Sequence, residues 1–493
     1  MKTQPNPTRI VILSLLLILS LAGLVACTPG RPDANAEPAI ALEPCRLAAD
    51  VAAQCGTLTV FENREAASGR TIDLHIAIIP ATTSLLRPDP LFLLAGGPGQ
   101  AATEAFPLIL NLFTDINKER DLVLVDQRGT GRSNPLSCDS SAEESLVRPV
   151  SDEDVVALAQ ACAAGLDADL TQYTTDAAMA DLEDVRAALG YEQINLFGVS
   201  YGSRAALTYL RVYPERVRSL ILDGVVGPEL VLYLQAPRDG QQALELLFAR
   251  CTADPVCHEE FPELAAEFQA LLVQLETPLT MQVSHPLSGK QLDVTLTSDL
   301  FSQIIFNLLY STDLASLLPL LIHQAYQRSD FSPLVAQGLI LTSETGLYDG
   351  LLYSVTCAED APFINLAEAE TMQVGTSFPL MARQFVAGCA IWPHGQAPAE
   401  LRRPVVSDVP ALLFSGEADP ITPPQYAEQV AETLSNSLHL VIPGYGHNVI
   451  GIGCLPLLAA NFVALGTAAG LDTTCLDTIQ PPPFFIDPAG PRP

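Results

Sequence analysis

One stretch of the chain, Ile194–Arg204, constrains both the fold and the chemistry. It reads Ile-Asn-Leu-Phe-Gly-Val-Ser-Tyr-Gly-Ser-Arg, an apolar run that passes through a glycine-flanked serine, Ser200, into a helix-forming segment. Gly-x-Ser-x-Gly between a strand and a helix is typical of a tight turn that lifts the serine above the end of a sheet. The free N–H groups of the following helix point at the same place. We predict that Ser200 is a nucleophile, the alternative being an ordinary serine in a glycine-rich turn.

Short, nearly all-apolar runs surround this stretch and predict a mostly parallel sheet that is buried on both faces. These predicted strands are Leu91–Ala95, Leu122–Val125, Ile194–Phe197, Val217–Leu222, Ala411–Phe414 and Leu438–Ile442. A hairpin of Gly56–Phe61 and Thr71–Ile79 precedes them, since both segments have the β-branched, alternating character of strands. Segments with helical periodicity between the strands, such as Thr175–Leu189, indicate an α/β fold.

The alternation of strands and helices stops between Gly227 and about Arg403. This region is mostly helical, and its clearest predicted helices are Gln241–Cys251, Phe261–Leu275, Asp299–Leu309 and Leu314–Gln327. We interpret it as a largely helical cap inserted after the sixth core strand, with the sheet resuming at Val409.

An acid and a base follow the serine in the order that a catalytic triad requires. A serine hydroxyl needs a base to take its proton, and the base needs an acid to fix its tautomer. Asp419 and His447 each follow a predicted strand in a glycine-containing loop, where open α/β sheets build their sites. Glu417 competes for the role of the acid. The alternatives are a helix-capping aspartate and an exposed loop histidine.

The loop after the strand Leu91–Ala95 reads Gly-Gly-Pro-Gly-Gln and fits an oxyanion hole. A tetrahedral intermediate needs preorganised N–H donors, one of them from the residue after the nucleophile, which is Tyr201 here. For the second donor we favour the amide of Gly97, with that of Gly96 as the alternative. A plain Gly-Pro turn without this role is the competing interpretation.

Five segments together resemble the proline iminopeptidase and tripeptidyl aminopeptidase group of serine hydrolases. They are Gly96-Gly-Pro-Gly-Gln, Asp126-Gln-Arg-Gly-Thr-Gly-Arg-Ser133, Gly198-Val-Ser-Tyr-Gly-Ser-Arg204, Ser415-Gly-Glu-Ala-Asp-Pro-Ile-Thr-Pro423 and Gly446-His447. The resemblance covers roughly Cys45 to Cys475, and it implies an α/β-hydrolase fold and cleavage of peptides at a free N-terminus. Ala95 departs from the histidine usual in the short iminopeptidases, so a preference for proline does not follow.

The resemblance also implies a carboxylate that binds the substrate ammonium. The segment Val355-Thr-Cys-Ala-Glu359-Asp360 is similar to the Cys-x-Glu segment of the family, which makes Glu359 the candidate. A surface acid beside a disulfide is the alternative. Asp126 and Arg128 are expected to stabilise the sheet edge and the oxyanion loop. Trp392 is expected in the cap, either as core or as pocket lining.

The N-terminus has the features of a secretory signal. Lys2 and Arg9 precede an apolar run, Ile10–Ala26, that ends at Cys27. The sequence Leu-Val-Ala-Cys resembles a bacterial lipobox, so we expect lipidation at Cys27 and a proline-rich tether after it. The alternatives are an uncleaved membrane helix, although the run is slightly short for a span, and ordinary secretion.

The chain has 11 cysteines, and setting Cys27 aside leaves an even number, as expected of an exported protein with disulfides. They fall into the sequence-local couples Cys45/Cys55, Cys138/Cys162, Cys251/Cys257, Cys357/Cys389 and Cys454/Cys475. Sequence alone does not prove this connectivity. Metal binding is the alternative, and the absence of Cys-x-x-Cys and the scattered histidines argue against it.

The formal net charge of −31 argues against nucleic acid and anionic lipid as main partners.

We expect an exported, lipid-anchored serine exopeptidase that needs no cofactor and no metal, acting on peptides with a free N-terminus. An esterase or lactonase with the same triad is the second hypothesis, and a silent binding lipoprotein is the third. The predicted organisation is a signal peptide over 1–26, a tether over 27–44, core over 45–227, the cap over 228–403, core over 404–480 and a proline-rich tail over 481–493.

Overall fold

The structure is a computed structural model that describes residue 1 and residues 40–138, 147, 150–343 and 346–491. The chain divides into two compact units, Met1–Ala39 and Ile40–Pro493. Residues 2–26 of the predicted signal segment and Cys27 lie outside the described residues. No helix within the described ranges is both long and apolar enough to cross a membrane.

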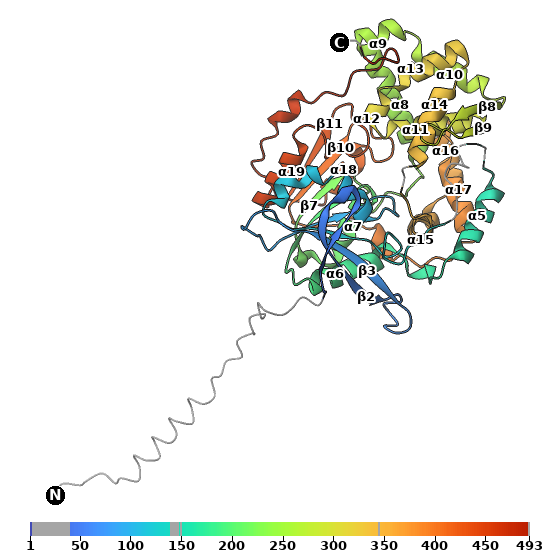
Figure 1. Ribbon diagram of the computed structural model, residues 1–493. Helices are drawn as coiled ribbons and strands as arrows, with labels where there is room; N and C mark the ends of the chain where they lie inside the picture. Colours follow the sequence, from blue (N-terminus) through green and yellow to red (C-terminus); the bar gives the residue numbers. More distant parts are fainter. Residues whose placement is uncertain (2–39, 139–146, 148–149, 344–345, 492–493) are drawn as a thin grey trace. The chain divides into compact units, whose positions relative to one another are not determined.

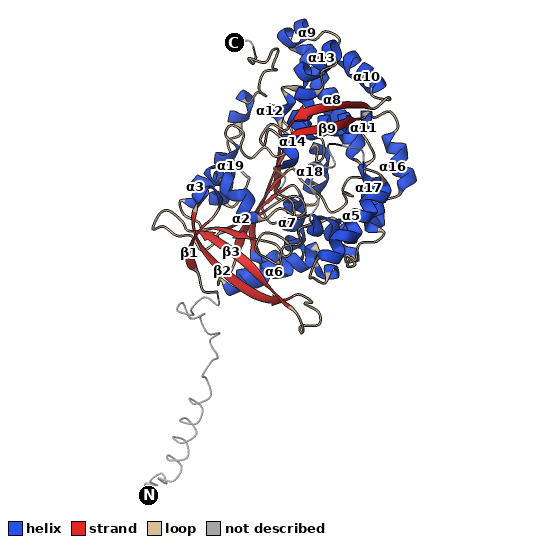
Figure 2. Ribbon diagram, turned by 45° about the vertical axis from the view of Figure 1, so that its right-hand side comes forward, coloured by secondary structure: helices blue, strands red, loops and turns tan. Residues whose placement is uncertain are grey.

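A nine-stranded sheet in the order β1-β2-β3-β5-β4-β6-β7-β10-β11 forms the core (Figures 1 and 2). Its strands are β1 Glu43–Arg46, β2 Ala52–Phe61, β3 Thr71–Ile79, β4 Leu91–Leu94, β5 Leu122–Val125, β6 Ile194–Val199, β7 Val217–Asp223, β10 Ala411–Gly416 and β11 Ser437–Ile442. The strands from β5 to β11 in this order pair in parallel, while β1, β2 and β3 join antiparallel at one edge. Every predicted core strand is confirmed.

Strand β1 was not predicted. It is a four-residue edge strand that contains Pro44 and pairs only with β2, so it carries neither an apolar run nor a clear alternation. Because β1 precedes the predicted strands, the cap follows the seventh strand of the chain, β7, rather than the sixth.

Apolar side chains cover both faces of the sheet, which explains why its central strands read as continuous apolar runs. Along β4, Phe92 and Leu94 pack with helices α6, α7 and α18, while Leu91 and Leu93 pack with α2, α3 and α19. The helices of the core are α2 Ala102–Ala105, α3 Thr114–Asn117, α6 Thr175–Ala188, α7 Tyr201–Val212, α18 Pro424–Ala431 and α19 Leu455–Leu465. Helix α5 Asp152–Gly165 packs instead against α17 Met381–Cys389 of the cap.

The cap contains the predicted helices and one element that we did not predict. Its helices are α8 Ala236–Ala253, α9 Pro255–Glu260, α10 Leu264–Gln274, α11 Ser298–Leu309, α12 Thr312–Ala315, α13 Leu318–Arg328, α14 Ser332–Ser343, α15 Asp349–Glu359, α16 Leu366–Gln373 and α17 Met381–Cys389. The additional element is an antiparallel hairpin of β8 Leu279–Ser284 and β9 Gln291–Leu296, which lies beside the cap helices in Figure 1. Its strands alternate apolar and polar residues, so the signal was present in the sequence.

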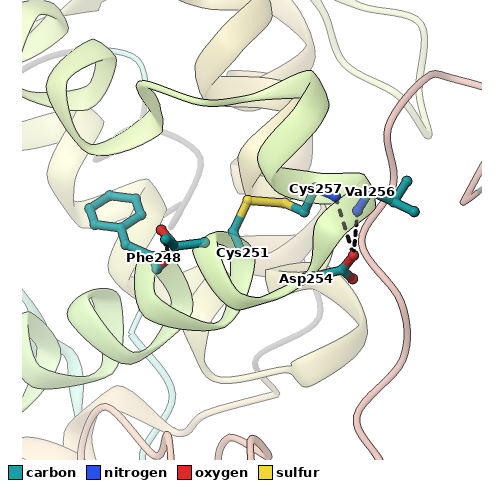
Figure 3. Close-up of a disulfide and its surroundings, with 6 residues drawn as sticks. Phe248, Cys251, Asp254, Val256 and Cys257 are labelled. Carbon is teal, nitrogen blue, oxygen red and sulfur yellow. Dashed lines mark hydrogen bonds between the residues drawn. A yellow bond between two sulfur atoms is a disulfide. The ribbon is translucent and has the colours of Figure 1, made fainter.

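All five predicted cysteine couples form disulfides. The bonds are Cys45–Cys55, Cys138–Cys162, Cys251–Cys257, Cys357–Cys389 and Cys454–Cys475. Figure 3 shows the bond that joins the last turn of α8 to α9, where Asp254 accepts hydrogen bonds from the amides of Val256 (2.9 Å) and Cys257 (3.3 Å). Disulfides of this number are typical of proteins from oxidising compartments.

Candidate active site

Ser200 lies in the tight turn between β6 and α7, as predicted. Its backbone has φ 55° and ψ −126°, a left-handed conformation that is uncommon for a residue with a side chain. Both flanking glycines are needed. A Cβ on Gly198 would lie 2.4 Å from the carbonyl oxygen of Gly202, and a Cβ on Gly202 would lie 2.2 Å from that of Leu94. The packing of α7 against β4 therefore requires the two glycines of the motif.

The loops after β10 and β11 bring Asp419 and His447 together, as predicted. His447 Nδ1 lies 2.7 Å from Asp419 Oδ2. Thr422 Oγ1 donates to the same oxygen at 2.7 Å and lies 3.0 Å from His447 Nδ1. With the Nδ1 proton directed at the carboxylate, Nε2 is left as the acceptor, which is the tautomer that a general base needs.

Asp419, and not Glu417, contacts the histidine. Glu417 is exposed and accepts a hydrogen bond from the Gly444 amide at 2.8 Å. Burial raises the pKa of Asp419, but the charge and hydrogen bond of His447 and the amides of residues 421 and 422 outweigh it, so the pKa is lowered. Burial lowers the pKa of His447, but the charge and hydrogen bond of Asp419 outweigh it, so this pKa is raised. Each partner thus stabilises the charged form of the other.

Asp223, the last residue of β7, connects the serine turn to the histidine loop. Its carbonyl oxygen accepts a hydrogen bond from the Ser200 amide at 2.8 Å. Its carboxylate accepts from the amides of Val449 and Ile450 at 2.9 and 2.8 Å. The next residue, Gly224, lies so close to the imidazole of His447 that a Cβ there would be 2.8 Å from Cε1. Ser200 and His447 therefore approach the same two residues at the end of β7.

The predicted triad lacks the hydrogen bond between its serine and its histidine. Within the part of the chain that the structure describes, no hydrogen bond joins Ser200 Oγ to His447. Such contacts commonly tighten only in the complex with substrate. The cap contacts the histidine directly, since the His447 amide donates to the carbonyl oxygen of Tyr310 at 2.8 Å and the two rings pack edge to face at 5.3 Å.

The glycine loop after β4 lies beside the serine. A Cβ on Gly96 would be 3.2 Å from the Cβ of Ser200, and the Gly96 amide donates to the side chain of Gln100 at 3.2 Å. The Gly96 amide is thus occupied, whereas the amides of Gly97 and Tyr201 have no acceptor among the described residues. This difference favours Gly97 over Gly96 as the second oxyanion donor.

Two family models match the chain. One describes the alpha/beta hydrolase fold and matches residues 89–251, and the other describes a TAP-like protein and matches residues 379–475. The nine-stranded sheet with its serine turn agrees with both. The chain has the α/β-hydrolase fold. It is a serine hydrolase with peptidase relatives, in line with the resemblance of its motifs.

Three of these relatives are as follows. The serine protease Hip1 of Mycobacterium tuberculosis is 26% identical over 86% of this chain and 87% of its own length. The tripeptidyl aminopeptidase of Streptomyces lividans is 30% identical over 39% of each chain. The proline iminopeptidase of Xylella fastidiosa is 33% identical over 28% of this chain and 32% of its own length.

Glu359 of this hydrolase is not open to a ligand. The side chain is fully buried at the end of α15, and both of its oxygens accept hydrogen bonds from Thr175, Oε1 from the amide at 2.6 Å and Oε2 from the hydroxyl at 2.8 Å. Burial raises its pKa to about 7, against the opposing effects of Arg204 and Thr175. A substrate ammonium has no route to a side chain without exposed surface, so the predicted contact is not available in this arrangement.

Asp126 and Arg128 lie where the sequence analysis expected them, beside the sheet edge. Asp126 accepts from the amide and the hydroxyl of Thr103 at 2.9 and 2.8 Å, which fixes α2 after the glycine loop. Arg128 forms a buried bidentate pair with Asp181, both contacts at 2.7 Å.

Trp392 is buried in the cap, and its indole N–H donates to the Ser354 hydroxyl at 3.1 Å, so it is core. Among the described residues no group of three or more His, Cys, Asp or Glu side chains could hold a metal ion.

Sequence reasoning did not single out Thr422, Asp223 or Thr175. Thr422 had a weak signal, because a threonine three residues after a loop aspartate commonly bonds back to it. The other two had none, since their partners lie far away in the chain.

Proposed function

We propose that this serine hydrolase is an exported aminopeptidase that releases one or a few residues from peptide N-termini through an acyl-enzyme. The observation that supports this most is the geometry of Asp419, Thr422 and His447 beside the strained turn of Ser200. Asp419 and Thr422 orient the imidazole of His447 as a general base needs, and in the proposal Ser200 is the nucleophile that this base deprotonates.

In the proposed reaction, Ser200 Oγ attacks the scissile carbonyl carbon and His447 Nε2 takes its proton. The amides of Gly97 and Tyr201 bind the oxyanion of the tetrahedral intermediate. His447 then protonates the leaving amine, and the C–N bond breaks to give the acyl-enzyme. A water molecule, deprotonated by His447, releases the acyl group and regenerates Ser200. Asp419 stabilises the imidazolium in both half-reactions.

Contacts between the cap and both halves of the site support exopeptidase action. Tyr310 of the cap contacts His447, and the side chain of Tyr201 packs among the residues of α15 and α17. In the proposal the cap restricts access to the site, so that the site accepts the end of a chain more readily than its middle. Two of the relatives carry names that describe cleavage at N-termini, tripeptidyl aminopeptidase and proline iminopeptidase.

The proposed place of action is outside the cytoplasm, at a membrane surface. Five disulfides support export. The sequence Leu-Val-Ala-Cys that ends at Cys27 supports attachment through lipid at that cysteine. In this proposal the catalytic domain is anchored by acyl chains, and its partner is the peptide substrate.

A panel of matched substrates tests the proposal. Tripeptidyl and aminoacyl nitroanilides with a free N-terminus are compared with their N-acetylated forms and with nitrophenyl butyrate, with Ser200→Ala protein as the background control. We expect kcat/KM for a free N-terminus to exceed that of the acetylated form by about 100-fold, equivalent to about 2.7 kcal/mol of ammonium recognition. Equal hydrolysis of the acetylated forms would contradict aminopeptidase action. A preference for the ester with no peptide cleavage would favour the esterase hypothesis.

A further inference from the structure

Two consecutive acidic residues of the cap are linked to the first turn of the helix that follows the nucleophile, one directly and one through Thr175. Asp360, directly after α15, forms a buried bidentate pair with Arg204 at 2.9 and 3.2 Å. Glu359, the last residue of α15, binds Thr175, whose hydroxyl oxygen lies 2.7 Å from the phenol oxygen of Tyr201. The end of one cap helix is thus connected to two positions of α7, one turn apart.

The direction of the hydrogen bonds between Tyr201, Thr175 and Glu359 follows from which groups can donate and which can accept. In its ionised form the Glu359 carboxylate only accepts, so in that form the hydroxyl of Thr175 donates its one proton to Glu359. The oxygen of Thr175 is then the acceptor for the Tyr201 O–H. The result is a directed chain from Tyr201 through Thr175 to Glu359, in which every member is at most 1% exposed.

This arrangement is costly for the protein. Burying a carboxylate is unfavourable unless it is paired and hydrogen-bonded. Acidic residues at a helix C-terminus also face the negative end of the helix dipole. Arg204 and Arg402 offset part of this cost through Asp360, and Arg402 also donates to the backbone carbonyl oxygen of Glu359 at 2.8 Å, but among the described residues no arginine donates a hydrogen bond to the Glu359 carboxylate. The main direct partner of Glu359 is therefore the Thr175–Tyr201 chain.

Tyr201 is the residue whose backbone amide is assigned to the oxyanion hole. Its side chain belongs to the same buried apolar cluster as Leu351 and Val355 of α15 and the Cys357–Cys389 disulfide. Anchoring this side chain fixes the orientation of the peptide unit that joins Ser200 to Tyr201. Loss of one oxyanion donor in a serine protease costs 10²–10³-fold in kcat, so a small rotation of this peptide unit has a measurable effect.

We propose that Glu359 is a positioning residue: acting through Thr175, it holds Tyr201 so that its backbone amide points at the oxyanion. This inference rests on the proposed function, because it assumes that Ser200 is the nucleophile. If Glu359 positions Tyr201, the rate of acylation depends on how the end of cap helix α15 packs against α7. This role of Glu359 does not require contact with the substrate.

The test measures how fast a fluorophosphonate reacts with Ser200, because the phosphonyl oxygen occupies the oxyanion hole whatever the peptide specificity. Thr175→Val removes the central hydroxyl while keeping the shape, and Thr175→Ser restores it. Glu359→Gln and Tyr201→Phe remove the two ends of the chain. Glu370→Gln, an exposed cap carboxylate paired with Arg383, is the matched control. Thermal unfolding verifies that each variant is folded.

We expect about a ten-fold loss in labelling rate for Thr175→Val, Glu359→Gln and Tyr201→Phe, and no further loss when Glu359→Gln and Tyr201→Phe are combined. Thr175→Ser and Glu370→Gln should label like the wild type. Steady-state kcat should fall with little change in KM, equally for free and acetylated substrates.

Wild-type labelling rates in the three variants would overturn the inference. So would a rise in KM confined to substrates with a free N-terminus, which would indicate ammonium binding. A wild-type enzyme that is not labelled at Ser200 would instead overturn the proposed function itself.

Discussion

The backbone N–H of Ser200 donates to the carbonyl oxygen of Asp223 at 2.8 Å, and the carboxylate of the same aspartate holds the chain just after His447. One buried residue at the end of β7 therefore sets the positions of two loops that are far apart in the sequence. Burial raises the pKa of Asp223 to about 6 in spite of the two amide donors, so its charge is held in the folded protein at a cost.

Asp223→Asn should lower both activity and stability. Asparagine keeps one acceptor oxygen, but its NH₂ group faces an amide N–H, so one of the two bonds is lost. We expect at least a ten-fold lower kcat and a free energy of unfolding that is about 1–3 kcal/mol smaller. Enzyme assays and urea unfolding measure the two effects. Asp167→Asn, at a fully exposed side chain, is the control. An unchanged kcat in Asp223→Asn would show that this connection does not position the histidine.

Thr422→Val should reduce catalysis without exposing the site. The variant loses the hydroxyl that donates to Asp419 Oδ2 and lies against His447 Nδ1, while the methyl groups preserve the packing. A hydrogen bond to a charged group contributes about 1.5–3 kcal/mol, so kcat/KM should fall by roughly 10- to 100-fold. Thr422→Ser should retain most of the activity. If both variants were fully active, the hydroxyl would have no role in orienting the pair.

The pH profile should follow His447. Its pKa is raised above the ordinary 6.5, and only the neutral imidazole can act as the base. Activity should therefore appear as pH rises through a midpoint above 6.5. In Asp419→Asn the raising charge is gone while burial remains, so the midpoint should move to lower pH and the plateau should fall by about 10⁴-fold. Profiles of kcat/KM for both proteins test this. An unchanged midpoint would show that Asp419 does not affect the pKa of the titrating group.

Cys27→Ser should prevent lipid attachment. In the proposal, the mature native protein begins at a diacylglyceryl-modified Cys27 and needs detergent for extraction. The variant should retain its signal segment while the catalytic domain folds and stays active. Mass spectrometry of the N-terminal peptide reports the modification. A mature protein that begins well beyond Cys27 and is extracted without detergent would indicate ordinary secretion.

The central fold could be predicted because strands such as Leu91–Leu94 are buried on both faces and leave a continuous apolar run. The disulfides could be predicted from the spacing of the cysteines. Strand β1 could not, since an exposed edge strand with a proline has no such pattern. The cap hairpin could have been recognised from its alternation, but the surrounding helices dominated the interpretation of that region.

The site was predictable only in part, for a physical reason. Ser200, Asp419 and His447 each follow a strand in a glycine-containing loop, so local sequence reveals them. The carboxylate of Asp223 bonds to Val449 and Ile450, and Thr175 bonds to Glu359, all more than 180 residues away in the chain, and nothing local distinguishes Asp223 and Thr175 from other polar residues. For Glu359 the motif predicted contact with the substrate, whereas in the structure the side chain is buried against Thr175.

The most direct measurement of the central claim is the identity of the residue that a fluorophosphonate modifies. The purified protein is labelled, digested and analysed by tandem mass spectrometry, in parallel with a Ser200→Ala variant of unchanged thermal stability. We expect a single stoichiometric adduct on Ser200 in the wild type and none in the variant. An adduct on another residue, or labelling of Ser200→Ala at the wild-type rate, would contradict the claim.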